Sequence, residues 1–309
     1  MNKFTRRTVI AAACAAAAMT FGPMSFAQQA PEKKDVTIAV GGKSLYYYLP
    51  LSIAEQLGYF KDEGLNVKIV DFQGGSRSLQ AVVGGSADVV SGAFEHTISM
   101  QAKKQPMTAF VLQGRAPQLA LVVSNKTMKD YKQLSDLKGK KVGVTAPGSS
   151  SQMVANFILK KGGLGPKDVA FIGVGSSSGA VSAIRSGQID ALINLDPVIT
   201  ILLKNGDAKL VADTRKVKES ESFFGGTMPA GCLYAPVSFI EKNPQTVQAL
   251  TNAIVRADEW LSKATPEEVA KVVPASYLMG NRDIYLAGFE GNRDALSPDG
   301  RFPDGCAKI

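Results

Sequence analysis

Apolar residues along the chain occur either in short continuous runs or at helical spacing. The runs Val36–Val40 and Val67–Phe72 are typical of buried strands, and the stretch between them predicts a helix over about Leu49–Glu63. A later segment, Asn243–Leu261, carries apolar residues on one helical face. Strands that alternate with helices are typical of parallel sheets covered by helices. We therefore expect an α/β fold.

The order of these elements occurs twice. Ala81–Val90 and Ala183–Leu192 each run from the end of a helix, through Gly85 or Gly187, into a short apolar strand. A glycine in that position adopts the left-handed conformation that ends a helix. The repeat predicts two similar lobes in tandem.

Two segments are expected to carry the chain between the lobes. Gln118–Ser124 is an apolar strand that follows a proline, and Gly231–Tyr234 is a second apolar run. This places lobe 1 at residues 36–118 plus 234–309, and lobe 2 at residues 119–233.

The N-terminal residues predict an export signal over residues 1–27. Met1–Arg7 is basic, Thr8–Phe21 is weakly apolar, and small residues precede a cleavage point after Ala27. The paired arginines favour the twin-arginine route, an ordinary Sec signal remains an alternative, and a lipid anchor at Cys14 is a third and weaker one. All of them deliver the chain outside the cytoplasm, and we expect a periplasmic protein.

Charge and composition limit the function classes. The formal net charge of +8 falls to +5 without Lys3, Arg6 and Arg7, and the chain has no blocks of like charge. Nucleic-acid binding is therefore not indicated, whereas a mildly positive surface suits anionic small ligands. Cys232 and Cys306 do not define a zinc site, and whether they pair stays open. We expect no cofactor and no metal.

The strongest chemical signal is a set of loops rich in glycine and serine. In open parallel sheets, ligands bind beyond the carboxyl ends of the strands. Helix N-termini and serine hydroxyls there offer hydrogen-bond donors to an anion, although each loop on its own is also explained by helix capping. The loops at these ends are Gly41–Tyr48, Gly74–Ser78, Ser91–Glu95, Ala146–Ser151, Gly175–Gly179 and Asn194–Pro197.

Aromatic and titratable residues in these loops are further candidates. Of the run of three tyrosines, we expect one or two, Tyr46 and Tyr47, to reach the cleft. Glu95 and His96 suggest an acid–base pair, but consecutive helical residues do not face each other, and a carboxylate at a helix start explains Glu95. We therefore do not expect an enzyme.

Asp196 precedes a proline after the last strand of the second unit. Its carboxylate either caps the following helix or meets a cationic group of a ligand, and the sequence favours neither. The chain contains no dinucleotide fingerprint and no phosphate-loop spacing.

In combination, several segments resemble the nitrate/sulfonate/taurine group of ABC-transporter substrate-binding proteins, also called the sulfonate-binding or thiamine-precursor-synthesis-like group. The segments are Leu51–Phe60, Lys61–Val67, Gly84–Val90, Leu137–Val144, Gly148–Ser151 and Ile189–Pro197. The resemblance implies a periplasmic binding protein of the second structural class, with two Rossmann-like lobes on a two-stranded hinge. It also implies a monomer that closes on a small anionic ligand and docks on an ABC permease with its ATPase.

The resemblance implies a set of ligand-facing residues as well. These are Gly75, Ser76, Gly92, Ala93, Ser149, Ser150 and Ser151, with Glu95 a weaker correspondence. Family members often have Trp where this chain has Leu195, so the pocket is not expected to be identical. The family usually continues some tens of residues beyond Pro303. An exported ligand sensor, and an enzyme of the thiamine-pyrimidine type, are the alternatives; the latter carries a cysteine-rich cluster that this chain lacks.

Overall fold

A computed structural model describes residues 29–304 of the chain. The predicted export signal, with Cys14, and the C-terminal Cys306 lie outside the described residues. The chain divides into two units, Met1–Ala30 and Pro31–Ile309, and the description below concerns the second. Within residues 29–304, no helix combines the length and the apolar character that crossing a membrane requires.

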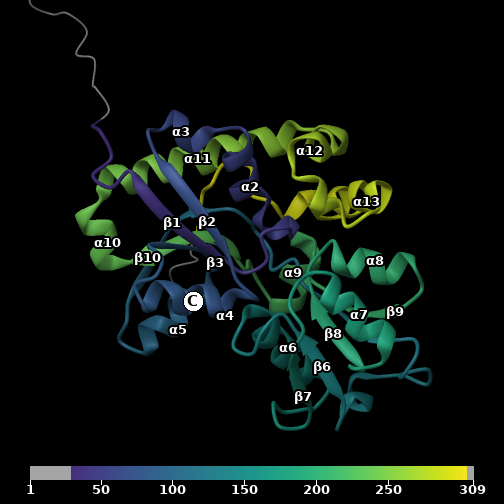
Figure 1. Cartoon of the computed structure of the whole chain (residues 1–309). Helices are drawn as coiled ribbons and strands as arrows, with labels where there is room; N and C mark the ends of the chain where they lie inside the picture. Colours follow the sequence, from purple (N-terminus) through teal and green to yellow (C-terminus); the bar gives the residue numbers. More distant parts are fainter. Residues whose placement is uncertain (1–28, 305–309) are drawn as a thin grey trace, which may run out of the picture. The chain divides into compact units, whose positions relative to one another are not determined.

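Lobe 1 is built on a five-stranded sheet (Figure 1). Its strands, in spatial order, are β2 (Asn66–Asp71), β1 (Asp35–Val40), β3 (Val89–Ala93), β10 (Gly231–Pro236) and β4 (Met107–Leu112). The helices of this lobe are α2 (Leu49–Gln56), α3 (Tyr59–Asp62), α4 (Gly75–Val83), α5 (Glu95–Ala102), α10 (Val237–Lys242) and α11 (Pro244–Lys263), and a 3-10 turn, η1 (Tyr46–Tyr48), precedes α2. In Figure 1, α4 and α5 lie on one side of the sheet, and α2, α3 and α11 lie on the other.

Lobe 2 repeats this arrangement on a second five-stranded sheet. Its strands, in spatial order, are β7 (Ala170–Gly173), β6 (Lys141–Val144), β8 (Ala191–Asn194), β5 (Ala120–Ser124) and β9 (Ala208–Asp213). Its helical elements are η2 (Leu134–Leu137), α6 (Ser150–Lys161), α7 (Ser178–Ser186) and α8 (Val198–Lys204). The duplicated strand order confirms the two-lobe α/β fold that the sequence repeat predicts.

The expectation of parallel sheets is wrong for one strand in each lobe. β10 runs antiparallel to both β3 and β4, and β5 runs antiparallel to both β8 and β9. These are the two strands that enter a sheet from the other lobe. Each therefore starts at the edge where the other strands end, which reverses its direction and makes both sheets mixed.

Glycines with positive φ set the helix ends that the repeat predicts. Gly85 and Gly187 have φ values of 76° and 81°, as expected for glycines that end a helix. The helix predicted over Leu49–Glu63 is interrupted at Gly58, with a φ of 78°, and so becomes α2 and α3.

Two connections join the lobes. The chain leaves the first sheet through residues 113–119 and returns through residues 214–230, which include α9 (Val217–Phe224). The connections bond to each other: the Thr214 N–H donates to the Leu119 carbonyl at 2.8 Å, and the Gln118 N–H donates to the Thr214 carbonyl at 3.1 Å. A paired, two-segment connection of this kind is the geometry of a hinge.

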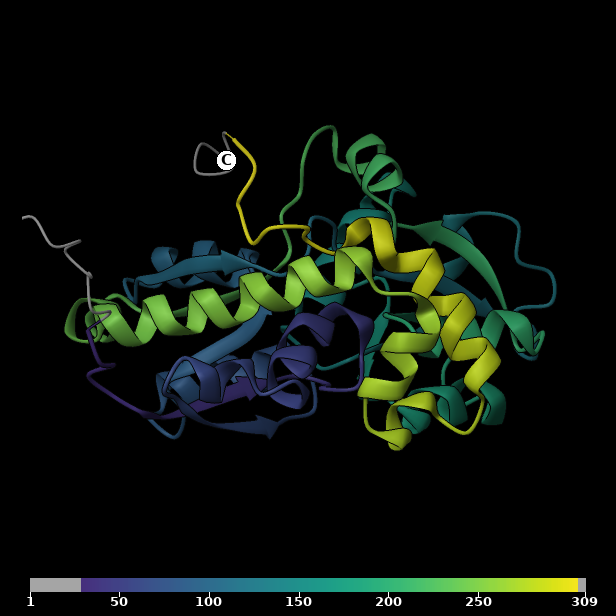
Figure 2. The same ribbon diagram turned by 90° about the horizontal axis from the view of Figure 1, so that it is seen from above.

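The C-terminal helices bridge the two lobes. α11 packs along α2 and α3 through the apolar face that its sequence predicts, and this face is buried. Beyond it lie α12 (Pro266–Val272), η3 (Ala275–Leu278), α13 (Arg282–Asn292) and η4 (Arg293–Ala295). Figure 2 shows α13, in yellow, beyond the end of α11, where it contacts α8 of lobe 2.

Candidate functional site

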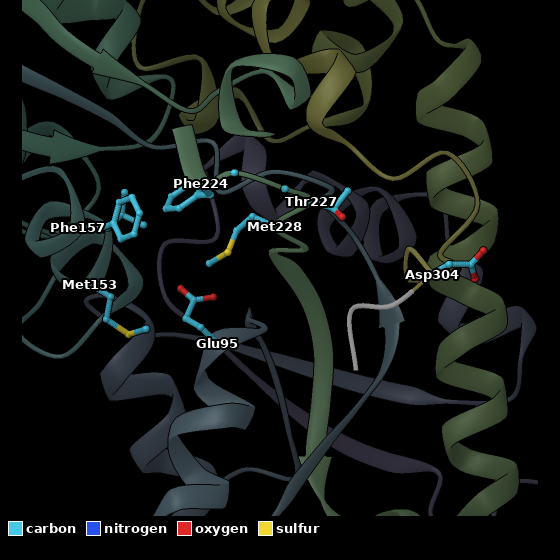
Figure 3. Close-up of a pocket in the computed structure, with 10 residues that line it drawn as sticks. Glu95, Met153, Phe157, Phe224, Thr227, Met228 and Asp304 are labelled. Carbon is cyan, nitrogen blue, oxygen red and sulfur yellow. The ribbon is translucent and has the colours of Figure 1, made fainter. Parts of the chain in front are cut away.

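A pocket of about 580 Å³ lies where the two lobes meet near the return connection. One wall is the start of α5 in lobe 1, the second is α6 of lobe 2, and the third is the segment that follows α9 (Figure 3). Its lining residues are Glu95, Met153, Val154, Phe157, Phe224, Gly225, Gly226, Thr227, Met228 and Asp304. The position between two hinged lobes is a preferred place for a small-molecule site.

The lobe 2 wall is an apolar face of α6. Met153 and Phe157 are four residues apart and therefore lie on the same side of the helix. Ile158 and Leu159, on the other side, are buried in the core of the lobe. Met153 remains 38% exposed and Phe157 41% exposed, although both are large and apolar. Exposed apolar groups gathered at a concave site are typical of ligand-binding and interaction surfaces.

Aromatic residues continue this wall onto the return connection. The Phe157 and Phe224 rings lie 5.0 Å apart between centroids, and Phe223 contacts both. Lys161, one turn after Phe157, places its ammonium 3.9 Å above the Phe223 ring and donates a hydrogen bond to the Phe223 carbonyl. These contacts hold α9 against α6 and fix the aromatic edge of the pocket.

Glu95 provides the polar group of the opposite wall. Strand β3 ends at Ala93, and the Phe94 N–H donates to the Ala230 carbonyl at 2.8 Å. This bond ties the start of α5 to the return connection and places Glu95 near Met228. The Glu95 carboxyl points into the pocket toward Met228, with Phe157 and Phe224 beyond (Figure 3).

The Glu95 side chain is 7% exposed, and within residues 29–304 no other residue donates a hydrogen bond to its carboxyl oxygens. Burial raises the pKa of this carboxyl to about 7, and the only opposing influence is its own backbone N–H. A buried carboxyl without a partner is costly for a fold to keep. This combination is characteristic of a functional group.

The neighbours of Glu95 do not neutralise its charge. Burial raises the pKa of Tyr47, Tyr48, Tyr234 and Cys232, and the charge of Glu95 raises each further. Within the described part of the chain, the pocket lining contains Asp304 as a second acid and no lysine or arginine. The pocket is therefore mostly apolar, and the ionisable groups in its described lining are acidic.

The predicted tyrosines divide between this site and the core. Tyr46 is fully buried, donates a hydrogen bond to the Tyr285 carbonyl at 2.6 Å and packs against Phe289. Tyr47 lies behind the pocket: it is buried, and Glu95 is the strongest charge acting on it. Neither tyrosine lines the pocket itself.

The serine and glycine loops contact each other across the lobes. The Ser76 N–H of lobe 1 donates to the Ser149 hydroxyl of lobe 2 at 3.0 Å, and the Ser76 hydroxyl donates to the Pro147 carbonyl at 2.8 Å. The two hydroxyls also bond at 3.2 Å. Gly74 allows this approach, because a Cβ there would lie 2.8 Å from the Cβ of Ala146. These donors are thus used by bonds between the lobes.

The remaining predicted loop residues lie around these contacts. The Ser151 hydroxyl bonds to the backbone N–H and the hydroxyl of Thr145, so it stabilises the turn before α6. The other predicted residues do not line the pocket either. Gly75 lies against the His96 ring, Gly92 and Ala93 are buried at the end of β3 with Gly92 against Tyr234, and Ser150 opens α6 half-buried.

Asp196 is buried, and its carboxylate is occupied by protein groups. One oxygen accepts the Thr200 N–H of α8 at 2.7 Å, as a helix cap does. The other accepts from Arg215 at 3.0 Å and from the Asn292 amide at 2.6 Å. Of the two roles that the sequence leaves open, the geometry provides the cap.

Glu95 and His96 face different sides of α5. The His96 Nδ1 lies 3.0 Å from the Tyr234 hydroxyl in the core of lobe 1, and burial lowers the pKa of its imidazole to about 4. The Glu95 carboxyl points into the pocket instead. The two residues are not arranged as an acid–base pair.

Sequence reasoning missed the apolar residues of the pocket, Met153, Phe157, Phe224 and Met228. A signal was present for two of them: Met153 and Phe157 fall outside the apolar stripe that α6 buries. Phe224 is the last residue of α9, and Met228 lies in the irregular segment that follows, so no apolar periodicity predicts that these two residues line a pocket.

Comparison with known proteins identifies the family of this chain. The model of the NMT1/THI5-like family matches residues 46–269. The chain belongs to this family. A solved protein from Bordetella bronchiseptica RB50 is 60% identical, with a TM-score of 0.90, and the alignment covers 91% of this chain and 88% of that one.

Other similar proteins are more distant in sequence. The alkanesulfonate-binding protein SsuA from Xanthomonas axonopodis, solved with MOPS, is 20% identical with a TM-score of 0.68, covering 90% of this chain and 89% of that one. The putative binding protein YtlA of Bacillus subtilis is 24% identical over 97% of this chain and 87% of its own length. A 4-amino-5-hydroxymethyl-2-methylpyrimidine phosphate synthase from Aspergillus parasiticus is 25% identical over 82% of this chain and 75% of its own length. The fold is thus that of the two-lobe periplasmic binding proteins.

Proposed function

We propose that this protein is the periplasmic solute-binding component of an ABC importer. The observation that carries the proposal is the apolar pocket of about 580 Å³ between two lobes that are joined by two paired connections. A solute that contacts both lobes would stabilise the closed arrangement, which a permease with its ATPase would then recognise. Family membership supports the same role.

The contacts between the lobes support a closing motion. Ser76 and Ser149 lie in loops of different lobes and bond directly. Ser149 is buried and Ser76 half-buried in this arrangement, and opening of the lobes would exchange their hydrogen bonds for bonds to water at small net cost. A solute that contacts both lobes in the neighbouring pocket would then shift the equilibrium toward the closed form.

The solute proposed is a small organic molecule. The serine and glycine loops favoured an anion, such as a sulfonate or carboxylate. Their donors serve bonds between the lobes, however, and the pocket itself is apolar with Glu95 as its buried polar group. Size and apolar lining therefore support an organic solute over an ion as small as nitrate.

An exported enzyme is a second candidate, since synthases of the pyrimidine phosphate type are among the relatives. The separation of Glu95 and His96 on α5 supports binding instead. Replacement of His96 by Ala distinguishes the two, because a receptor retains its solute affinity and an enzyme that depends on this imidazole loses turnover. A receptor that reports to a membrane kinase would bind the same solute but would not stimulate a permease.

The test is a thermal-shift screen of protein from which bound solute has been removed. Sulfonates, nitrate, carboxylates, pyrimidines and amines are compared on the wild type, Phe157→Ala and Leu210→Ala. Leu210 lies on β9 and is 41% exposed, like Phe157, but it does not line the pocket. We expect at least one solute to raise the melting temperature of the wild type and Leu210→Ala and to lose most of its effect on Phe157→Ala. No stabilisation by any solute would overturn the proposal.

A further inference from the structure

We propose that the pocket selects a cationic solute, an amine or amidine on a flat or alkyl apolar body, and that Glu95 is the residue that recognises its N–H groups. This inference rests on the proposed function and names the solute class of the same site. It differs from the anionic class that the glycine and serine loops suggested.

The carboxyl of Glu95 needs a hydrogen-bond partner that no other residue in the described part of the chain supplies. Glu95 is only 7% exposed, and its carboxyl points into the pocket. Within residues 29–304, this carboxyl accepts no hydrogen bond from another residue. Buried polar groups in folded proteins are nearly always paired. A ligand N–H would provide the missing donor, and a cationic one would form a charge-assisted bond.

The charges around the pocket favour a cation. Of the described residues, Glu95 and Asp304 are the ionisable groups in its lining. The groups packed behind Glu95 are tyrosine hydroxyls and a thiol, from Tyr47, Tyr48, Tyr234 and Cys232. Like charge placed beside a buried carboxylate costs energy, whereas opposite charge lowers the cost of burying both. Among residues 29–304, a sulfonate or carboxylate head would meet acids in this lining and no base.

The rest of the lining suits the body of such a solute. Met153 and Phe157 present exposed apolar surface from α6, and Met228 and Phe224 face it from the return connection. Aromatic faces and polarisable sulfur bind flat or alkyl groups, and an aromatic face also attracts a cation. A cationic head at Glu95 therefore places the body of the solute in contact with both lobes.

The test compares probes that differ in charge. Benzamidine, 2-phenylethylamine and hexylamine are measured beside benzoate, 3-phenylpropionate and hexanesulfonate, by thermal shift and calorimetry at pH 8, on the wild type, Glu95→Gln and Glu241→Gln. Gln preserves the shape of Glu95 and removes its charge, and Glu241 is an exposed glutamate on α10 outside the pocket. We expect at least one cationic probe to bind the wild type and Glu241→Gln, and to bind Glu95→Gln at least tenfold more weakly.

The possible outcomes distinguish failure of this inference from failure of the proposed function. If only the anionic probes bind, or if the cationic probes bind wild type and Glu95→Gln equally, the proposal of a cationic solute is wrong. The proposed function as a solute receptor would still stand. If neither these probes nor any member of the wider solute screen binds, the proposed function fails and the inference fails with it.

Discussion

Neutralising Glu95 should stabilise the solute-free protein, and by an amount that depends on pH. Burial raises the pKa of this carboxyl from an ordinary 4.5 to about 7. Between these values the folded state holds a proton that the unfolded state has released. The free energy of unfolding therefore falls as pH rises through this window and levels off above pH 7.

The size of the effect follows from the two pKa values. A shift from 4.5 to about 7 corresponds to about 3 kcal/mol of lost stability above pH 7, relative to a residue with no charge to bury. Glu95→Gln removes this loss. The variant should therefore equal the wild type near pH 4.5 and exceed it by about 3 kcal/mol at pH 8.

Urea unfolding of solute-free protein at half-unit steps from pH 4.5 to pH 8 measures this difference. Other titrating groups, including His96, are common to both proteins and cancel in the comparison. Parallel stability curves for the two proteins across the range would refute the reasoning, because they would mean that Glu95 titrates as an exposed glutamate does. Glu241→Gln, measured alongside, should give such parallel curves.

Three further substitutions test other parts of the structure. Asp196→Ala should lower the free energy of unfolding by about 2 kcal/mol in urea titration, since it removes the acceptor of the Thr200 N–H and one of the two carboxylates that pair with the half-buried Arg215. Asp258→Asn should raise that free energy at pH 7, because burial holds the pKa of this unpartnered carboxyl well above its usual range, so the folded state keeps a proton that the unfolded state has released; an unchanged midpoint would contradict this. Gly74→Ala should weaken solute affinity at least tenfold by calorimetry, since its Cβ would meet Ala146 of the other lobe, whereas Gly85→Ala, with a similar φ and no neighbour, should retain affinity.

The sequence predicted the fold well because the repeat carries the information. Gly85 and Gly187 mark equivalent helix ends, and the apolar face of α11 is unambiguous at helical spacing. The directions of β5 and β10 were missed, because strand direction depends on which lobe the chain arrives from. The local pattern of apolar and polar residues does not contain this information.

The residues of the site were harder to predict from the sequence than the fold. The sequence predicts Glu95 at the start of a helix. That no other residue within 29–304 donates a hydrogen bond to its carboxyl depends on how the return connection packs against β3, which is tertiary structure. Ser76 and Ser149 were recognised as donors that face a cleft, yet a sequence does not reveal that such donors face each other. Met153 and Phe157 resemble ordinary surface residues in the sequence, because the packing of Phe157 against Phe224 of α9 depends on tertiary structure.

The most direct test of the account is a crystal structure of the protein with the solute that it retains on purification from the cells that naturally produce it. We expect density for a small organic molecule between α6 and residues 224–228, in contact with both lobes and with a nitrogen within hydrogen-bond distance of Glu95. A solute bound outside the space between the lobes, or an anion held by the Ser76 and Ser149 loops away from Glu95, would contradict it.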